Sequence, residues 1–212
     1  MSQMKLLFKK QDLSIVPRWT DNIKDEWINP FITESCEDNF RNSISTTLYD
    51  AMANLVNPIV LGTQGEEWNN TDTFSVGSIV LYNQVYYIAL DAIIAAQPAP
   101  DVNSDWQVQP LVNFWATYVK PYLVYACYKS FVLWHGKHIS QGGMRKHIDN
   151  TSFEINSDEL GYLIGDLKNK ISLKLVAMNN YLSGVDYTFS NVKYDLNENV
   201  KRGSNSISIF AV

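Results

Sequence analysis

Hydrophobic residues recur at helical spacing in three long segments of the chain. The first segment begins near Thr33 and ends before Pro58. Its apolar positions follow one another every three or four residues, at Cys36, Phe40, Ile44, Leu48, Met52 and Leu55. The second segment runs from about Pro110 to Trp134, and the third runs from about Ser157 to Leu182. Residues spaced in this way lie on one face of a helix, so the pattern predicts three long helices.

Two prolines and two glycines refine the helix boundaries. Pro110 suits the first position of the second helix, where its missing N–H costs nothing. Pro121 falls inside that helix and is expected to kink or split it. His135-Gly136 is expected to begin the loop that follows. Gly184 suits the C-terminal end of the third helix.

Residues 62–107 interrupt the helical pattern. Alternation typical of a β-strand marks this segment at Val80, Tyr82, Val85 and Tyr87. Asn83-Gln84 lies between these positions and suits a tight hairpin turn. The helical pattern stops where the segment begins and resumes where it ends. We therefore predict a small β module inserted into a helical domain that consists of residues 1–61 and 108–212.

Both ends of the chain are expected to be extended arms. Residues 1–30 show no helical period, although Leu6–Phe8 suits a short strand. Residues 185–212 are polar and turn-rich until the final run Ile207–Val212, which alternates like a strand that needs a sheet edge. The predicted fold class is mainly α: a bundle of three long helices with extended terminal arms and a small inserted β module.

Composition excludes several classes of protein. The chain has 212 residues, of which 46% are hydrophobic, and its net charge is -5. No apolar run reaches the roughly 18 residues of a membrane span, and the start carries no secretory signal pattern. Two cysteines, Cys36 and Cys127, cannot form a disulfide framework. We expect a soluble protein made in a reducing cytoplasm.

Charge is distributed unevenly along the chain. Between Arg41 and Lys120 there is no lysine or arginine. That stretch holds the acids Asp50, Glu66, Glu67, Asp72, Asp91, Asp101 and Asp105. The following stretch holds only bases, at Lys120, Lys129, Lys137, Arg145 and Lys146, which are candidates for a basic interaction face. This segregation suits subunits that stack head to tail, or a face turned to a polyanion; ordinary surface charge is the alternative.

No residue constellation points to catalysis or metal binding. The histidines His135, His138 and His147 lack further ligands at zinc spacing. Cys36 and Cys127 lie on apolar helix faces, where a structural thiol is the simpler interpretation. The acid pairs Glu66-Glu67 and Asp158-Glu159 have no basic partner nearby in sequence. We therefore expect no enzyme, no metal and no cofactor.

The aromatic spacing of residues 62–107 resembles the small carbohydrate-binding module of chitinases and cellulases. The matching positions are Trp68, Phe74, Gly77, Val80, Tyr82, Tyr87, Ala89, Pro98 and Trp106. Gln84 stands where that family usually has glycine, and Ser78 stands where it often has aspartate. The resemblance implies Trp68, Tyr86 and Trp106 as interaction candidates. Because so small a module needs aromatic residues for its own core, we interpret them as packing or protein-contact residues, with glycan binding as the alternative.

The remainder of the chain resembles the helical head-to-tail connector (adaptor) proteins of tailed bacteriophages, especially those of crAss-like phages. The matching elements are Lys5–Phe8, Phe31-Ile32 with Leu48-Tyr49, Leu111-Val112 with Tyr118–Leu123, and Tyr181-Leu182. The resemblance implies a structural virion protein at the neck, made in the host cytoplasm, that forms a ring between portal and tail. Its implied partners are about eleven further copies of itself on a twelve-fold portal, the portal protein and the next connector or tail protein. DNA would pass through the channel without sequence-specific binding, and no membrane is involved.

Long arms of the kind predicted at both ends would link a ring subunit to its neighbours. The interaction candidates in the C-terminal arm are Ile207, Ile209 and Phe210. The leading hypothesis from the sequence is therefore a connector subunit. A carbohydrate-binding protein that uses the aromatic β module is the alternative, and an unrecognised enzyme is a weaker third.

Overall fold

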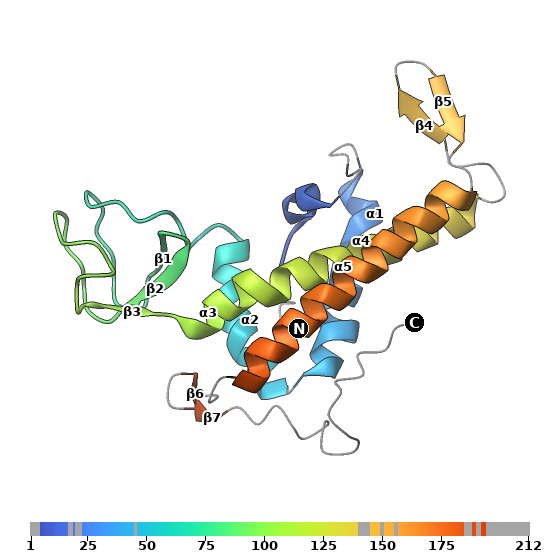
Figure 1. The fold of residues 1–212 in the computed structure, drawn as a ribbon. Coiled ribbons are helices and arrows are strands. Elements are labelled where there is room, and N and C mark those ends of the chain that lie inside the picture. The colour runs from blue at the N-terminus through green and yellow to red at the C-terminus, as the bar shows by residue number, and fades with distance from the viewer. Residues whose placement is uncertain are drawn as a thin grey trace. The chain divides into compact units, whose positions relative to one another are not determined.

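Helices make up most of the described chain, and a small antiparallel sheet accompanies them (Figure 1). The computed structural model describes residues 5–16, 19, 23–44, 46–139, 145–148, 151–154, 157–184, 188–189 and 192–193. This composition confirms the coarse prediction of a mainly α protein with a small β module. The arm residues Ile207, Ile209 and Phe210 lie outside the described residues.

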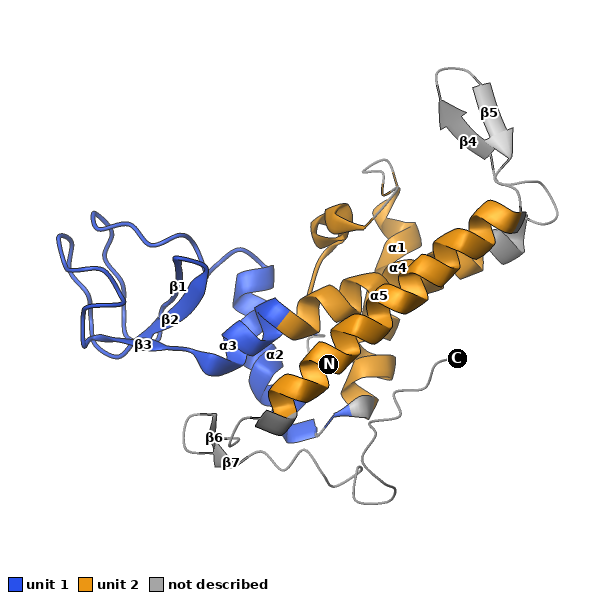
Figure 2. Cartoon of the chain, in the orientation of Figure 1, with its two compact units in different colours: residues 1–7, 44–117, 186–206 blue, residues 8–43, 118–185, 207–212 orange. Residues whose placement is uncertain are grey.

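The chain divides into two compact units (Figure 2). Unit 1 consists of residues 1–7, 44–117 and 186–206, and unit 2 consists of residues 8–43, 118–185 and 207–212. The small sheet lies in unit 1 together with two helices. The domain boundaries expected at residues 62 and 107 stay a prediction.

The sheet of unit 1 is a three-stranded antiparallel meander in the order β1-β2-β3. Its strands are β1 (Ile79–Tyr82), β2 (Val85–Ala89) and β3 (Trp106–Val108). The hairpin between β1 and β2 turns at Asn83 and Gln84, whose φ angles are 47° and 64°. Two successive residues of positive φ form the type of two-residue turn whose twist matches that of the strands. The predicted hairpin is confirmed.

Aromatic side chains fill the core of this sheet and its loops. Val80, Ala89, Ile93 and Trp106 form the buried cluster, and Trp68, Phe74 and Tyr87 pack against it. The rings of Phe74 and Trp106 meet edge to face with their centroids 5.4 Å apart. Backbone hydrogen bonds tie the long loops to the strands, for example from the Phe74 N–H to the Ile93 carbonyl at 2.9 Å. A module with three short strands therefore obtains its core from its loops.

Helices α2 (Thr46–Val60) and α3 (Pro110–Phe114) complete the helical part of unit 1. Pro110 occupies the first turn of α3, as predicted, and the Gln109 side chain accepts a hydrogen bond from the Leu111 N–H. The Trp115 indole N–H donates to the Leu7 carbonyl at 2.7 Å. Residues 5–9 form no strand, so the expected strand at Leu6–Phe8 is wrong. Leu7 is instead buried beside a side-chain donor.

Unit 2 is built around two long helices, α4 (Lys120–Ile139) and α5 (Ser157–Gly184). A π-helical turn, η4 (Trp115–Val119), precedes α4 directly. The Tyr118 and Tyr181 ring centroids are 4.8 Å apart, and the Lys170 Nζ lies 5.7 Å from the Tyr125 ring centroid. From the first contact to the second, the residue number rises from 118 to 125 on the α4 side and falls from 181 to 170 on α5, so the two helices pack antiparallel. A two-stranded hairpin of β4 (Arg145–Ile148) and β5 (Thr151–Glu154) follows α4 in the chain. A second hairpin, of β6 (Thr188–Phe189) and β7 (Val192–Lys193), follows α5 and belongs to unit 1.

The N-terminal part of unit 2 packs against α4 through aromatic rings. It comprises η1 (Lys10–Ile15), α1 (Asp25–Thr33), the π-helix η2 (Glu34–Phe40) and η3 (Arg41–Ser43). Phe31 lies edge to face with Phe131 and with Trp134, each at a centroid distance of 5.7 Å. Trp19 meets Tyr128 at 6.0 Å in the same manner. Aromatic rings, rather than a continuous stripe of aliphatic side chains, fill this part of the core.

The structure corrects the first predicted helix. Residues 25–33 are helical rather than extended, and the helix continues through η2 and η3 before α2 begins at Thr46. η3 ends at Ser43 and α2 begins at Thr46. The sequence here is rich in serine and threonine, residue types that weaken helices because their hydroxyls compete for backbone hydrogen bonds. η1 also replaces part of the expected extended arm.

The second and third predicted helices are confirmed with small shifts. The second continues to Ile139, so the loop expected at His135-Gly136 begins later. Pro121 is accommodated by the π-helical turn η4 that precedes it. Because proline crowds the carbonyl four residues before it, a local change of hydrogen-bonding pattern relieves the clash.

Candidate interaction surfaces

The three module aromatics singled out in the sequence occupy different environments. Trp106 is buried, with 5% of its surface exposed, and is a core residue. Trp68 is half-buried and meets Tyr82 edge to face at 5.4 Å. Tyr86 is half-buried and lies 6.4 Å from Trp115. A sugar platform needs exposed and coplanar rings, and none of the three contributes a broadly exposed face.

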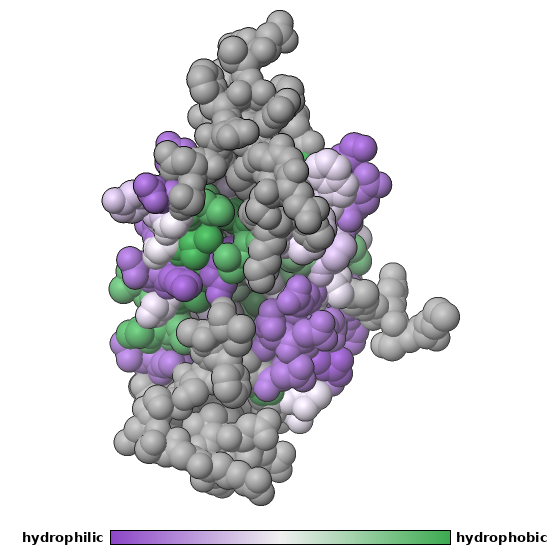
Figure 3. All heavy atoms as spheres, turned by 90° about the vertical axis from the view of Figure 1, so that its right-hand side faces the viewer, coloured by the Kyte–Doolittle hydropathy of each residue, from purple (hydrophilic) through white to green (hydrophobic). Residues whose placement is uncertain are grey.

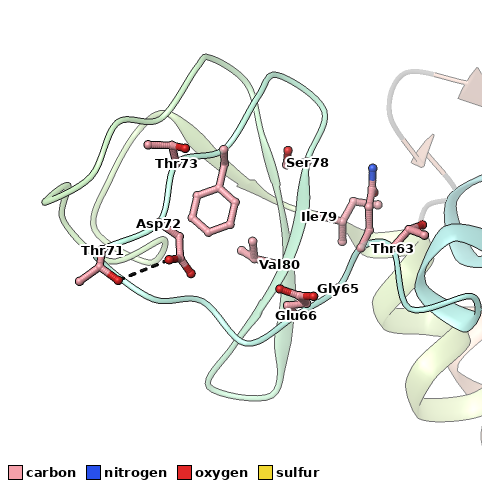
Figure 4. Close-up of a pocket in the computed structure, with 11 residues that line it drawn as sticks. Thr63, Gly65, Glu66, Thr71, Asp72, Thr73, Ser78, Ile79 and Val80 are labelled. Atoms are coloured by element: carbon pink, nitrogen blue, oxygen red, sulfur yellow. Dashed lines mark hydrogen bonds between the residues drawn. The ribbon is translucent and has the colours of Figure 1, made fainter.

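A shallow groove lies beside β1 in unit 1 (Figure 4). Its volume is about 560 Å³. It is lined by Thr63, Gln64, Gly65, Glu66, Thr71, Asp72, Thr73, Phe74, Ser78, Ile79 and Val80. Figure 4 shows Asp72 and Glu66 on opposite sides, and the Thr71 hydroxyl donates to the Asp72 carboxylate at 3.4 Å. Hydroxyls, carboxylates and one aromatic ring in an open groove suit a small polar ligand.

The acids expected on an acidic part of the chain all belong to unit 1. Residues 44–117 contain no lysine, arginine or histidine. Asp50, Glu66, Glu67, Asp72, Asp91 and Asp101 are exposed there, and Asp105 is half-buried. The charged side chains of this stretch of unit 1 are therefore all negative.

Four exposed aliphatic side chains lie in the loops of the β module. They are Val76, Leu90, Ile94 and Val102, with 48% to 74% of their surface exposed. Their turns are joined by backbone hydrogen bonds from Gly77 to Ala89 and from Leu90 to Asp105.

A second exposed stripe lies on α5. Leu173 and Val176 are 68% and 52% exposed, and Tyr162 is 81% exposed. At about 100° per residue these three positions fall within about 60° of one another on the helix. On the same reckoning Lys170, Lys168 and Lys174 lie about 60°, 80° and 100° from the nearest of these positions, and Asp166 lies about 20° from Leu173, while residues 167–184 contain no acid. We call Leu173, Val176 and these three lysines the α5 face.

The three lysines of the α5 face differ in their partners. Lys170 donates to Asp166 at 2.9 Å, and this hydrogen bond raises the lysine pKa. Among the described side chains, Lys168 and Lys174 form no ion pair. Burial, and then the nearby Lys168, lowers the pKa of Lys129 on α4. The lysines of α5 therefore concentrate positive charge where α4 contributes another lysine.

The basic residues predicted from the sequence are only partly described. Lys120 is bonded to Asp12 of η1 at 3.1 Å, so it serves unit 2 internally. Lys129 is half-buried. The side chains of Lys137, Arg145 and Lys146 lie outside the described residues. Sequence reasoning missed the lysines of α5, although the absence of any acid after Asp166 in that helix was a readable signal.

The two cysteines are buried in unit 2, on η2 and α4. Burial, with a smaller contribution from Cys36, raises the pKa of the Cys127 thiol. A neutral, inaccessible thiol is a poor nucleophile. The side chains of His135, His138 and His147 lie outside the described residues.

Exposed hydrophobic side chains occur in both units. Figure 3 shows one face of the molecule, on which green hydrophobic groups form separate islands between purple hydrophilic ones. Among the described residues no three histidine, cysteine or acidic side chains gather as metal ligands. None of the described helices is long and apolar enough to span a bilayer. Comparisons with protein-family models, curated proteins and solved structures found no match to this chain.

Proposed function

We propose that this chain is a structural subunit of a tailed-phage particle, a head-to-tail connector that forms a ring between portal and tail. The observation that carries the proposal is the separation of charge between residues 44–117, which contain no base, and the C-terminal part of α5, which contains no acid. A ring closes through contacts between two different surfaces of each subunit. Surfaces of opposite charge meet favourably and exclude wrong orientations.

The long helices support this role. α4 and α5 pack antiparallel, and α5 has 28 residues, which corresponds to about 42 Å at 1.5 Å per residue. We propose that they form the core of a connector bundle together with α1 and η2 of the same unit. In this proposal the chain termini act as arms that reach neighbouring subunits.

The partners follow from the same proposal. The subunit would contact further copies of itself, the portal protein, and the next connector or tail protein. Its net charge of -5 suits a channel wall along which DNA slides. A basic lumen would instead hold DNA by salt-dependent contacts with its phosphates. We therefore place the α5 face against protein rather than DNA.

Fractionation of particles tests the proposal. Lysates of an infected culture are separated on a density gradient, and the chain is quantified by mass spectrometry with a peptide such as residues 175–193. We expect the chain to band with DNA-filled particles at about the copy number of the portal protein. A chain found only in the soluble fraction would exclude the connector.

Glycan binding by the β module is a second candidate. The groove beside β1 favours it, because that groove combines hydroxyls and carboxylates with the ring of Phe74. Retention on chitin and cellulose beads, and tryptophan fluorescence with added chito-oligosaccharide, test this function. We expect Asp72→Asn to abolish retention if the groove binds sugar, whereas Asp91→Asn, outside the groove, should leave retention unchanged. No retention of the unsubstituted chain would exclude this candidate.

A further inference from the structure

The segment formed by α1 and η2 packs antiparallel against α4 within unit 2. Phe31 of α1 meets Phe131 at a ring-centroid distance of 5.7 Å. Phe40 of η2 meets Tyr122 at 6.3 Å. From the first contact to the second, the residue number rises by nine on the α1–η2 side and falls by nine on α4. The two ring contacts therefore fix the register between the segments that they join.

The two cysteines of the chain occupy matching places between these contacts. Cys36 lies four residues before Phe40, and Cys127 lies four residues before Phe131. Residues four apart share a face of a helix, so each thiol lies on the same face as a contacting ring. Both cysteines are 0% exposed. The register therefore sets the two thiols opposite each other in the core between η2 and α4.

An electrostatic effect agrees with this placement. Burial, and then Cys36, raises the pKa of the Cys127 thiol. Such an effect requires the two groups to be close to each other. The raised pKa also keeps the thiol neutral and slow to react while the helices are packed. The pair is therefore protected in the closed form, although its two members face each other.

We propose that Cys36 and Cys127 are a modification site, at which a small disulfide such as oxidised glutathione forms one disulfide bond within the chain. Opening of η2 from α4 exposes a thiol, whose thiolate attacks a sulfur of the small disulfide, forms a mixed disulfide and releases one small thiol. The second cysteine attacks the protein sulfur of that mixed disulfide and releases the other small thiol. The cysteines lose two protons and two electrons, and the small disulfide gains them. This modification does not depend on the proposed connector.

The bond fastens the N-terminal helices of unit 2 to α4. It closes a loop of residues 36–127, which carries α2, the β module and α3. Crosslinks that close long loops remove the most freedom from the unfolded chain. The bonded chain should therefore unfold at a midpoint higher than that of the reduced chain by roughly 5–15 °C. A bonded chain that unfolds at a lower temperature than the reduced chain would show that the folded state does not hold the thiols face to face.

Refolding in glutathione buffers tests the bond. The full chain is unfolded in urea and diluted into buffers with a rising ratio of oxidised to reduced glutathione, so that both thiols meet the oxidant before they are buried. Free thiols are then alkylated after an acid quench. Tryptic digestion without reduction should join residues 25–41 to residues 42–129 within one copy, and reduction should separate these peptides. Free thiols at every ratio, glutathione adducts that never resolve to this bond, or bonds only between copies would overturn the proposal.

A shifted cysteine provides the matched control. Cys127→Ala with Ala126→Cys keeps the composition and moves the thiol by one residue, about 100° around α4. The ratio of glutathione at which half of the chain is bonded is measured for both proteins. The shifted variant should require a ratio that is more oxidising by on the order of tenfold or more, because its thiol no longer faces η2. Equal ratios in the two proteins would mean that the helix register does not favour the pair, and would overturn the proposal.

Discussion

Units 1 and 2 reach a packed core by different means. Every residue of positive φ in the described chain lies in unit 1: Gly62, Gly65, Gly77, Asn83, Gln84 and Ala96. The described part of unit 2 has none and changes direction through helix ends and a π-helix, η2. Unit 1 therefore depends on particular backbone conformations at turns. Unit 2 depends on which side chains meet between helices.

The units also differ in their charge. The central stretch of unit 1 is acidic throughout, whereas unit 2 mixes both signs and forms ion pairs such as Lys120–Asp12 and Lys10–Asp25. Internal pairs cost a unit some of its capacity to attract a partner, because the charges are already compensated. The difference teaches that unit 2 compensates part of its charge by ion pairs within the unit. Substitutions that act on one unit but not the other are the sharpest way to examine it.

Removal of the central indole of the module should have the largest effect. Trp106→Ala deletes the largest buried side chain of the module core and should destabilise that core by about 3–5 kcal/mol. Hydrogen exchange at the amides of β2 should then rise, while exchange in α5 should stay slow. Val102→Ala, at a residue 74% exposed in the same module, should cost less than about 0.5 kcal/mol. If the amides of α5 lost protection from exchange to the same extent, the cores of units 1 and 2 would not be independent.

A pair of glycines separates steric crowding from backbone conformation. Gly65 and Gly77 have φ angles of 80° and 82°, so alanine at either position is strained by about 1–2 kcal/mol. A Cβ on Gly65 would lie 2.8 Å from the Ile59 Cγ2, whereas a Cβ on Gly77 would meet nothing within 4 Å. Gly65→Ala should therefore cost about 1–3 kcal/mol more than Gly77→Ala in urea unfolding. Identical costs would show that only φ matters.

Alkaline pH should destabilise unit 2 through its buried thiol. Burial raises the folded-state pKa of Cys127 above its ordinary value of 9.0, so folding favours the neutral thiol. The stabilisation is complete below about pH 9 and falls by about 1.4 kcal/mol for each pH unit above it, because the unfolded chain then loses the proton first. Tyr122, whose pKa burial also raises, adds the same trend from about pH 10.

Urea unfolding at several pH values measures this slope. Cys127→Val removes the titrating group and should flatten the decline just above pH 9. An unchanged slope in that variant would assign the decline to other groups. Between about pH 7 and about pH 8 both proteins should show the same pH dependence, because neither state ionises the thiol there.

The smallest effect is a gain of stability at the hairpin turn. Gln84 adopts a φ of 64°, which glycine reaches without strain, and Asn-Gly is the preferred pair for such a turn. Gln84→Gly should stabilise unit 1 by about 0.5–1 kcal/mol. Ala95→Gly, at an exposed position of ordinary φ, should instead destabilise it by about 0.5–1 kcal/mol. Thermal unfolding measures the stability of both variants. A loss of stability in both would show that the positive φ of Gln84 is not strained.

The elements predicted well from the sequence carry local signals of their own. Pro110 begins α3, an uninterrupted apolar period defines α5, and Asn83-Gln84 turns the hairpin. The apolar spacing of the first helix continues past Ser43 and predicts one piece, whereas η3 ends at Ser43 and α2 begins at Thr46. α1 was missed because Pro30 argues against helix, although the proline lies inside α1. Packing of Phe31 against α4 decides that segment, and no local pattern records it.

The candidate surfaces were predictable only in part. The absence of bases from residues 44–117 is visible in the sequence, and so is the run of lysines in α5. The exposure of Leu90, Ile94 and Val102 is not, because hydrophobic residues in a sequence suggest a core. Val102 lies in the loop before β3 and Trp106 begins that strand. Both are apolar, and only the fold assigns Trp106 to the interior. Burial is a property of the whole module.

The base-free stretch of unit 1 has a consequence for proteolysis. Trypsin cleaves after lysine and arginine, and it does not cleave the Lys120 bond because Pro121 follows. Even the unfolded chain therefore yields residues 42–129 as a single piece, which carries the whole β module, α2 and α3. Digestion of the folded chain would release this piece only when the bonds after Arg41 and Lys129 become accessible. The rate at which this fragment appears therefore measures how fast α4 and η3 open at these two cleavage sites.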